Sequence, residues 1–349
     1  MLDKNAEVFL SLTRAGLWEK KVQLSPYGDI DYKEVFQIAE VQTVVGLVAA
    51  GFEHVIDVRI PQEIVLQFVG QTLQLEQRNK AMNCFIGKLL VLLREAGIYT
   101  LLVKGQGIAQ CYERPLWRTS GDIDLLVDKD YYQKAVHSLL PMSTYSKPEG
   151  RYSKHFGLTV DPWYIEVHGS MRSSLSWRVD EMIDRIQSDT FYKDNVRTWR
   201  NGDTDVFLPA PDNDVFFVFT HILQHLYKEG IVLRQICDLC RLLWAYRESL
   251  NYGLLVSRIR KAGLLAEWKA FAALAVAHLG MPAEAMPMYD SRFRDKGTRV
   301  LEFILKRKPY SKVRDTWAIA KIFPWNTLKF SPSIFFNVNG LKIKERIFG

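Results

Sequence analysis

The sequence feature that most constrains this chain is the stretch TSGDIDLLVD at residues 119–128, in which two aspartates interrupt an apolar run. Successive side chains of a β-strand point to opposite faces, so Asp122 and Asp124 share one face and the neighbouring apolar side chains take the other. Two adjacent carboxylates at the end of a buried strand repel each other and lose hydration, so another group must offset this cost. The pair favours a magnesium and nucleotide phosphate site, although solvated turn caps also produce Asp-x-Asp pairs.

Composition and hydropathy place the chain among ordinary soluble proteins. Its 349 residues are 48% hydrophobic and 24% charged, which is enough apolar material to bury a full core. The N-terminus lacks the pattern of a secretory signal, and the apolar run Val41–Phe52 is too short to span a bilayer. Four cysteines do not form a dense disulfide framework, so we expect a cytoplasmic protein without a transmembrane segment.

The positive charge of the chain is concentrated near its C-terminus. Residues 301–349 contain ten Lys and Arg residues against three Asp and Glu residues, and the whole chain has a formal net charge of +7. The same segment contains aromatic residues and prolines, so it could pack as an irregular extension, dock on an anionic membrane or contact nucleic acid. Because it lacks a clear amphipathic period, packing with a solvated basic face is the favoured interpretation.

The period of the apolar residues changes along the chain. Helical periods fill residues 1–97, shorter β-rich runs follow, and helical periods return from residue 212 to about residue 280. We therefore predict an α+β fold, in which a small mixed sheet is flanked by helical regions at both ends. The predicted regions are an N-terminal helical region (1–97), an α/β core (98–210), a C-terminal helical region (211–290) and a basic aromatic tail (291–349).

A third carboxylate is expected beside the two aspartates. The runs HFGLTV (155–160) and WYIEVHG (163–169) alternate and are joined at Asp161-Pro162, which predicts an antiparallel hairpin. In the most economical pairing its second strand lies next to the strand that carries the two aspartates. Glu166 would then point to the same side as Asp122 and Asp124, whereas on an isolated edge strand it would point to water.

A glycine turn and a loop supply candidate phosphate-binding groups. Lys104, Gly105 and Gln106 end one strand and open a helix, where backbone N–H groups and a positive helix end could meet phosphate oxygens. The following loop supplies Arg118, whose guanidinium is suited to bidentate phosphate contact, and the hydroxyl of Ser120. The alternative for Arg118 is a surface ion pair, and most glycine turns only reverse the chain.

The run LLVKGQGIAQCYERPLWRTSGDIDLLV (101–127) resembles the uncharacterised nucleotidyltransferase family of bacteria, a branch of the DNA polymerase beta nucleotidyltransferase superfamily. The superfamily has a glycine and a small polar residue at a helix start, then an acid-x-acid strand and a later strand acid, which correspond here to Gly105, Asp122, Asp124 and Glu166. The resemblance is strongest over residues 98–170 and extends to FLSLTRAGLW, HILQHL and DLCRLL. Gln106 departs from the serine that often follows the glycine.

The resemblance implies a small mixed nucleotidyltransferase sheet and a metal-dependent reaction. A nucleoside monophosphate would pass from an NTP such as ATP to an acceptor hydroxyl, with release of pyrophosphate. Asp122, Asp124 and Glu166 would bind Mg²⁺ or Mn²⁺ and act as the catalytic acids. His168, two residues after Glu166, could orient the acceptor or a carboxylate, or be an ordinary exposed histidine.

Two other patterns allow competing interpretations. His221, His225, Cys237 and Cys240 could supply a tetrahedral zinc site if two helices meet, but their apolar helical context favours packing. His221, His225 and Asp238 could instead line the cleft opposite the sheet, near the base or the acceptor. A non-catalytic nucleotide sensor or scaffold on the same fold is the alternative to an enzyme, and the presence of all three acids argues against it.

Overall fold

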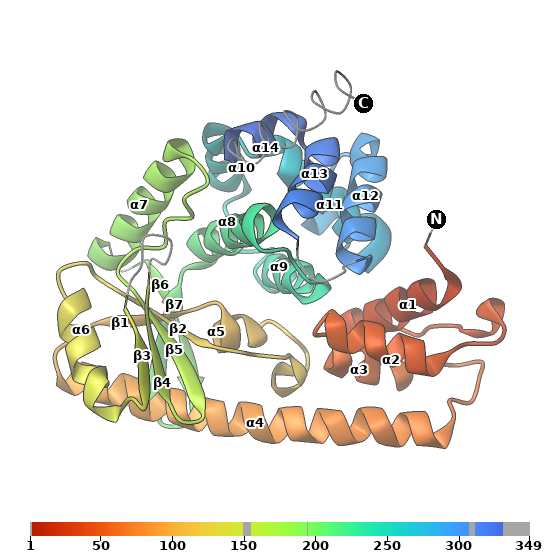
Figure 1. Cartoon of the computed structure of the whole chain (residues 1–349), viewed down its shortest axis with the longest axis horizontal. Helices are drawn as coiled ribbons and strands as arrows, with labels where there is room; N and C mark the ends of the chain where they lie inside the picture. The colour runs from red at the N-terminus through yellow and green to blue at the C-terminus, as the bar shows by residue number, and fades with distance from the viewer. Residues whose placement is uncertain (1, 149–154, 194, 307–310, 331–349) are drawn as a thin grey trace, which may run out of the picture.

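A single long helix, α4 (Gln62–Glu95), runs beneath both the β-sheet and the N-terminal helices, as Figure 1 shows. At a rise of about 1.5 Å per residue it is about 50 Å long. The computed structural model describes residues 2–148, 155–193, 195–306 and 311–330. The fold is α+β, as predicted, with helices on both sides of a mixed sheet.

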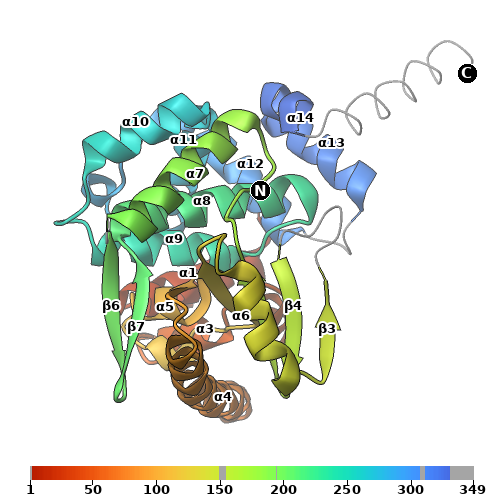
Figure 2. The same ribbon diagram turned by 90° about the vertical axis from the view of Figure 1, so that its left-hand side faces the viewer.

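The sheet has five strands in the order β1-β2-β5-β4-β3. Strands β2 and β5 are parallel, and the other neighbouring pairs are antiparallel. A separate hairpin, β6–β7, lies on the other side of α4 from β3 and β4 (Figure 2). The strands are β1 (Thr100–Val103), β2 (Ile123–Val127), β3 (Tyr145–Lys147), β4 (His155–Val160), β5 (Trp163–His168), β6 (Val196–Asn201) and β7 (Thr204–Pro209).

The predicted hairpin and its position in the sheet are confirmed. Strands β4 and β5 pair antiparallel across Asp161-Pro162, and β5 lies directly beside β2. The apolar side chains of β2 and β5 point to one face, where they form a buried cluster with α4 and α6 (Tyr132–Leu139). Packing on this face leaves the polar side chains of the same two strands on the opposite face.

The N-terminal helices are α1 (Lys4–Trp18), α2 (Tyr32–Val41) and α3 (Val45–Phe52); α2 and α3 pack beside α4, and α1 packs on α2 and α3. Helices α1 and α3 touch through their backbones, because a Cβ at Gly16 would lie 1.9 Å from the carbonyl oxygen of Leu47. A Cβ at Gly51 would similarly lie 2.1 Å from the carbonyl oxygen of Leu12. Only glycine permits this close crossing, so these positions fix how the two helices pack.

The C-terminal helices form a second layer above the sheet and α5 (Gly105–Ala109). Their apolar faces share one large core with α1, α2 and α3, which joins the two ends of the chain. The helices are α7 (Trp177–Tyr192), α8 (Pro211–Lys228), α9 (Leu233–Ala245), α10 (Tyr252–Ala262), α11 (Leu265–Leu279), α12 (Arg294–Leu305), α13 (Lys312–Ile322) and α14 (Pro324–Phe330).

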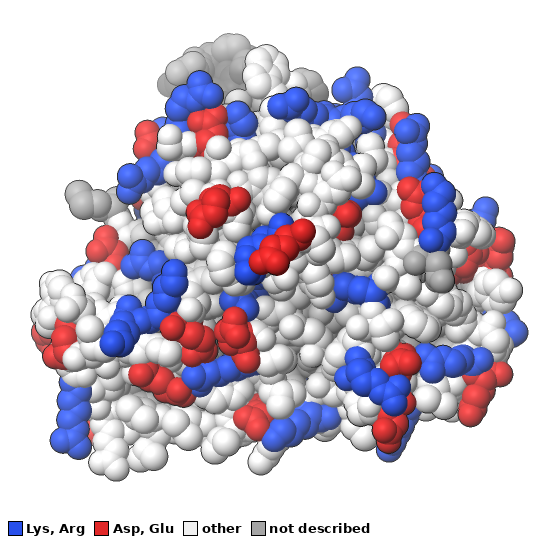
Figure 3. All heavy atoms as spheres, turned by 180° about the vertical axis from the view of Figure 1, so that it is seen from behind, with Lys and Arg blue, Asp and Glu red and all other residues white. Residues whose placement is uncertain are grey.

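The start of the basic tail forms the helices α12, α13 and α14, so the expectation of an irregular extension is wrong for residues 294–305, 312–322 and 324–330. Helix α14 packs on the C-terminal helices through Phe330, whose ring lies edge-on to Tyr227 at 5.0 Å. Residues 331–349 lie outside the described part of the chain, so the interpretation of their basic residues stays a prediction, as does the division into four regions. On the face seen from behind, positive and negative side chains are interspersed (Figure 3).

None of the helices in the described part of the chain combines the length and the apolar character needed to cross a bilayer.

The helix crossing leads to a stability prediction. Gly16→Ala places a methyl group against the α3 backbone, so it should lower the free energy of unfolding by at least about 1–3 kcal/mol. Gly70→Ala in α4 is the matched control, because a Cβ there has nothing within 4 Å and should stabilise the helix by about 0.5–1 kcal/mol. Urea unfolding of both variants tests this, and equal stability of the two variants would contradict the packing described for α1 and α3.

Candidate active site

Three carboxylates converge on the polar face of the sheet. The register of the parallel pair β2 and β5 sets Asp124 directly beside Glu166, and Asp122 precedes β2 on the same side. One carboxylate oxygen from each of Asp122, Asp124 and Glu166 lies within 4.8 Å of the others. The arrangement follows from strand alternation, as the sequence predicted, because residues two apart share a face.

Lys104 contacts the most buried of these carboxylates. Its Nζ donates a hydrogen bond of 2.7 Å to Asp124 Oδ1, because Val103 at the end of β1 is paired with Asp124. The backbone of Lys104 has φ +59°, a conformation that costs a non-glycine residue on the order of 1–3 kcal/mol. Burial opposes the charged ammonium, but Asp124, followed by Asp122 and Glu166, raises the pKa of Lys104.

A chain of histidine contacts holds the carboxylates from the other side. His168 Nε2 lies 2.9 Å from Asp124 Oδ1 and 3.3 Å from Glu166 Oε2. His155 Nε2 lies 3.2 Å from Glu166 Oε1. Burial disfavours protonation of His168, but its hydrogen bonds to Asp124 and Glu166 raise its pKa above the ordinary value. Glu166 is therefore held between two imidazole rings.

The charges of the three carboxylates are incompletely balanced. Burial opposes ionisation of Asp124, but the charge of Lys104 and the hydrogen bond from His168 outweigh it and hold the pKa of Asp124 well below its usual range. The pKa of Asp122 is raised, first by repulsion from Asp124 and then by burial. A cation bound beside Asp122 would relieve this repulsion.

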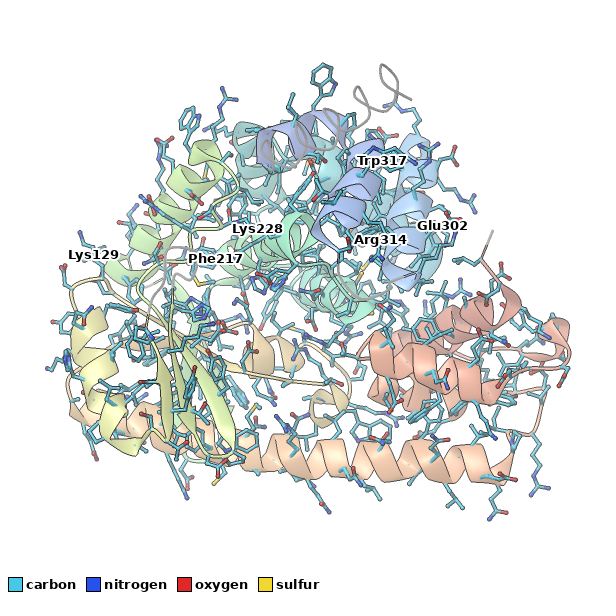
Figure 4. All side chains as sticks on the ribbon, in the orientation of Figure 1. Lys129, Phe217, Lys228, Glu302, Arg314 and Trp317 are labelled. Atoms are coloured by element: carbon cyan, nitrogen blue, oxygen red, sulfur yellow. The ribbon has the colours of Figure 1, made fainter. Side chains whose placement is uncertain are left out.

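The carboxylates face a cavity of about 610 Å³ between the sheet and the C-terminal helices. Helix α8 contributes Phe217 and Lys228 to its lining (Figure 4). Ten of the predicted site residues line it together: Lys104, Gly105, Arg118, Asp122, Asp124, Glu166, His168, His221, His225 and Asp238. The structure thus brings these residues to one place, and their individual roles remain predictions.

Arg118 is part of a buried ion-pair network. Its Nε and Nη2 atoms each donate a hydrogen bond of 2.7 Å to the two carboxylate oxygens of Asp238 on α9. Tyr112 and Arg234 donate to the same carboxylate at 2.8 and 3.1 Å. Burial opposes ionisation, but Arg118 and Arg234 lower the pKa of Asp238. This bidentate pair fixes the loop before β2 to α9, and it is buried, whereas the alternative expected for Arg118 was a surface ion pair.

Two predicted phosphate-binding side chains are engaged in other contacts. Gln106 is buried and its Nε2 donates to Asn79 Oδ1 on α4 at 2.8 Å, so its side chain points away from the carboxylates. The hydroxyl of Ser120 is buried and accepts a hydrogen bond from Arg118 Nη1 at 2.8 Å. Both side chains therefore support the glycine turn and the loop around the cavity.

The histidine and cysteine pairs have different surroundings. His221 and His225 line the cavity with their Nε2 atoms 3.1 Å apart, and burial lowers the pKa of His221 well below its ordinary value. Cys237 and Cys240 are buried in the core instead, where burial raises the pKa of Cys240 to about 12. Among the described residues, the clusters with metal-binding spacing contain neither cysteine.

Sequence reasoning missed several residues of the cavity. They were not predicted because none of them lies in the glycine turn, the acidic strand or the helical histidine motif. His155 alone carried a detectable signal, because the predicted hairpin pairs it with His168. The missed residues with charged or titratable side chains are Lys147, His155, Arg172, Lys228, Glu229 and Arg234.

The donor set suits a hard divalent cation. Mg²⁺ and Mn²⁺ prefer oxygen ligands, and the three carboxylate oxygens lie within 4.8 Å of one another. The raised pKa of Asp122 also agrees with a cation site, because it results first from repulsion by Asp124, and a bound cation would reduce this repulsion. Asp122, Asp124 and Glu166 are therefore the residues of this chain that could hold such an ion.

Comparisons with known proteins place the chain in a family. The model of a family described as uncharacterised nucleotidyltransferase matches residues 28–280, which is well over half of the chain. No curated protein matches the sequence. The chain is also similar to the crystal structure of an antigenic nucleotidyltransferase-like protein from Paracoccidioides brasiliensis, with 12% identity, 63% of this chain and 95% of that chain covered, and a TM-score of 0.32.

The Arg118 network leads to a prediction about stability. Asp238→Ala leaves the buried guanidinium of Arg118 unpaired, so it should lower the free energy of unfolding by about 3–5 kcal/mol. The control is Glu181→Ala, which breaks an exposed pair with Arg185 and should cost no more than about 0.5 kcal/mol. Chemical denaturation measures both values. A small effect of Asp238→Ala would mean that Arg118 is not anchored by this pair.

Proposed function

Because the chain belongs to the uncharacterised nucleotidyltransferase family, we propose that it transfers a nucleoside monophosphate from an NTP to an acceptor hydroxyl and releases pyrophosphate. The observation that carries the proposal is the convergence of Asp122, Asp124 and Glu166 on one wall of the cavity. Three carboxylates that repel one another are costly to maintain in a folded protein, and they are suited to binding a cation together with phosphate oxygens.

The reaction requires a divalent cation, and Asp122, Asp124 and Glu166 would hold Mg²⁺ or Mn²⁺ here. When bound, the cation supplies charge neutralisation for the triphosphate and favours ionisation of the acceptor hydroxyl. In the overall reaction a bond forms between the acceptor oxygen and the α-phosphorus, while the bond from the α-phosphorus to the bridging oxygen of pyrophosphate breaks.

Positive side chains of the cavity would bind and orient the triphosphate. Lys104 lies between the glycine turn and Asp124, so its ammonium can contact a phosphate oxygen without leaving the carboxylate. Arg234 lines the same cavity and has a lowered pKa, first because of burial and then because of the charge of Arg118. A bound phosphate would favour the charged form of Arg234, so we assign both residues to triphosphate binding.

Glu166 and His168 are placed to act on the acceptor. Glu166 lies beside Asp124 across the strand pair, so it is the carboxylate to which we assign the proton of the acceptor hydroxyl. His168 contacts both carboxylates through Nε2 and keeps them in a fixed relative position. His221 and His225 on α8 also line the cavity, where we assign them to contacts with the acceptor or the base.

The proposal predicts metal-dependent release of pyrophosphate. Each of the four NTPs would be incubated with Mg²⁺ or Mn²⁺ and a pooled panel of sugar, aminoglycoside, protein and RNA acceptors. We expect Asp122→Asn and Asp124→Asn to reduce turnover by about 10³-fold or more, because each removes an oxygen ligand whose bound cation contributes several kcal/mol. Pyrophosphate release is measured directly, and thermal melting confirms that each variant folds.

A matched control is available shortly after the same strand. Asp130→Asn changes an exposed carboxylate beyond the opposite end of β2, so it should leave turnover unchanged. Metal-dependent NTP binding that requires Asp122 and Asp124 but produces no pyrophosphate would favour the alternative of a nucleotide sensor. Failure to bind any NTP would contradict both the enzyme and the sensor.

A further inference from the structure

We propose that His155, Glu166 and His168 form a second cation site, suited to a transition metal such as Zn²⁺, beside the three carboxylates. Ligand atoms of these three residues lie within 4.8 Å of one another, and all three residues line the cavity. The site shares Glu166 with the carboxylate cluster but takes its other two ligands from histidine. It is therefore distinct in composition from a site made of Asp122, Asp124 and Glu166.

The separations of the ligand atoms match those around a tetrahedral metal. His155 Nε2 lies 3.2 Å from Glu166 Oε1, and His168 Nε2 lies 3.3 Å from Glu166 Oε2. Two ligands bound at about 2.0–2.1 Å with tetrahedral angles are about 3.4 Å apart. Both observed distances are close to this value.

The sheet holds the three ligands in position before any ion binds. His155 and His168 are directly opposite each other in the antiparallel pair β4 and β5, and their ring centroids are 5.2 Å apart. Glu166 and His168 are two residues apart on β5, so they share a face. Ligands on paired strands keep their spacing better than ligands on loops, which reduces the entropy cost of binding.

The nature of the donors predicts which cation the site prefers. Imidazole nitrogen binds Zn²⁺, Co²⁺ and related ions well, whereas Mg²⁺ prefers oxygen ligands and retains its water. Three protein ligands that face a cavity leave a coordination position for water or substrate, as in catalytic rather than structural zinc sites.

This inference does not depend on the proposed nucleotidyl transfer. The carboxylate site requires Asp122, and the histidine site requires His155, so one substitution can remove each without the other. The neighbouring cavity residues Asp124, Lys104 and His221 are not part of the histidine cluster. The competing explanation is that the two imidazoles only orient Glu166 by hydrogen bonding, and this explanation predicts no affinity for transition metals.

Cobalt binding tests the site, with Co²⁺ as the probe and the full-length protein freed of metals by a chelator. We expect one tightly bound Co²⁺ per chain with visible d–d absorption of a nitrogen-ligated ion, and displacement of this absorption by Zn²⁺ but not by equimolar Mg²⁺. His155→Ala should weaken Co²⁺ binding by more than about 100-fold, since losing an outer-shell partner alone costs about 10–100-fold. His137→Ala, on exposed α6 surface, is the control and should bind as wild type does.

Two further variants separate the alternatives. Asp122→Asn should keep the Co²⁺ absorption, and His155→Cys should keep binding while adding a thiolate-to-cobalt absorption band. His155 is partly exposed at the start of β4, so these variants are expected to fold, and circular dichroism checks it. Three results would each overturn the proposal, whatever the outcome of the pyrophosphate assay. They are unchanged Co²⁺ binding in His155→Ala, loss of the absorption in Asp122→Asn, and no Co²⁺ binding by the wild type.

Discussion

The parallel register of β2 and β5 brings Asp124 and Glu166 side by side, and the resulting repulsion determines the rest of the site. Repulsion from Asp124 raises the pKa of the nearby Asp122 carboxylate, and burial raises it further. Lys104 and His168 compensate Asp124, and the strained backbone of Lys104 is consistent with this functional constraint. The charge at Asp122 is not compensated by these two residues, and the proposed function assigns it to a bound cation.

The helical regions hold this arrangement in place from two sides. Helix α4 supports the apolar face of the sheet, and its Asn79 binds the Gln106 side chain next to the glycine turn. Helix α9 holds the loop before β2 through the buried pair of Arg118 and Asp238. Because removing either partner of such a pair is costly, the network fixes the distance between sheet and helices across the cavity. The cavity is thus formed by parts of the chain that are more than 100 residues apart.

The sequence was sufficient to predict the α+β class, the hairpin of β4 and β5 and the convergence of Asp122, Asp124 and Glu166, because all of these follow from strand alternation and short connections. The sequence was insufficient where contacts between distant parts of the chain determine the partner of a side chain. The partner of Arg118 lies on α9 and that of Gln106 lies on α4, and no local pattern records either pairing. The β6–β7 hairpin and the helices within 294–330 were also missed, since irregular apolar spacing and aromatic residues obscured their periods.

The most direct test of the central claim is to follow the two ends of the triphosphate separately. NTP labelled on either the α-phosphate or the γ-phosphate would be incubated with the protein, Mg²⁺ and the acceptor panel, and the label would be located on acceptor, pyrophosphate or inorganic phosphate. We expect the α label on the acceptor and the γ label in pyrophosphate, with both transfers lost in Asp124→Asn. Transfer of the γ label to the acceptor, or its release as inorganic phosphate, would show phosphoryl transfer or hydrolysis and contradict the assignment.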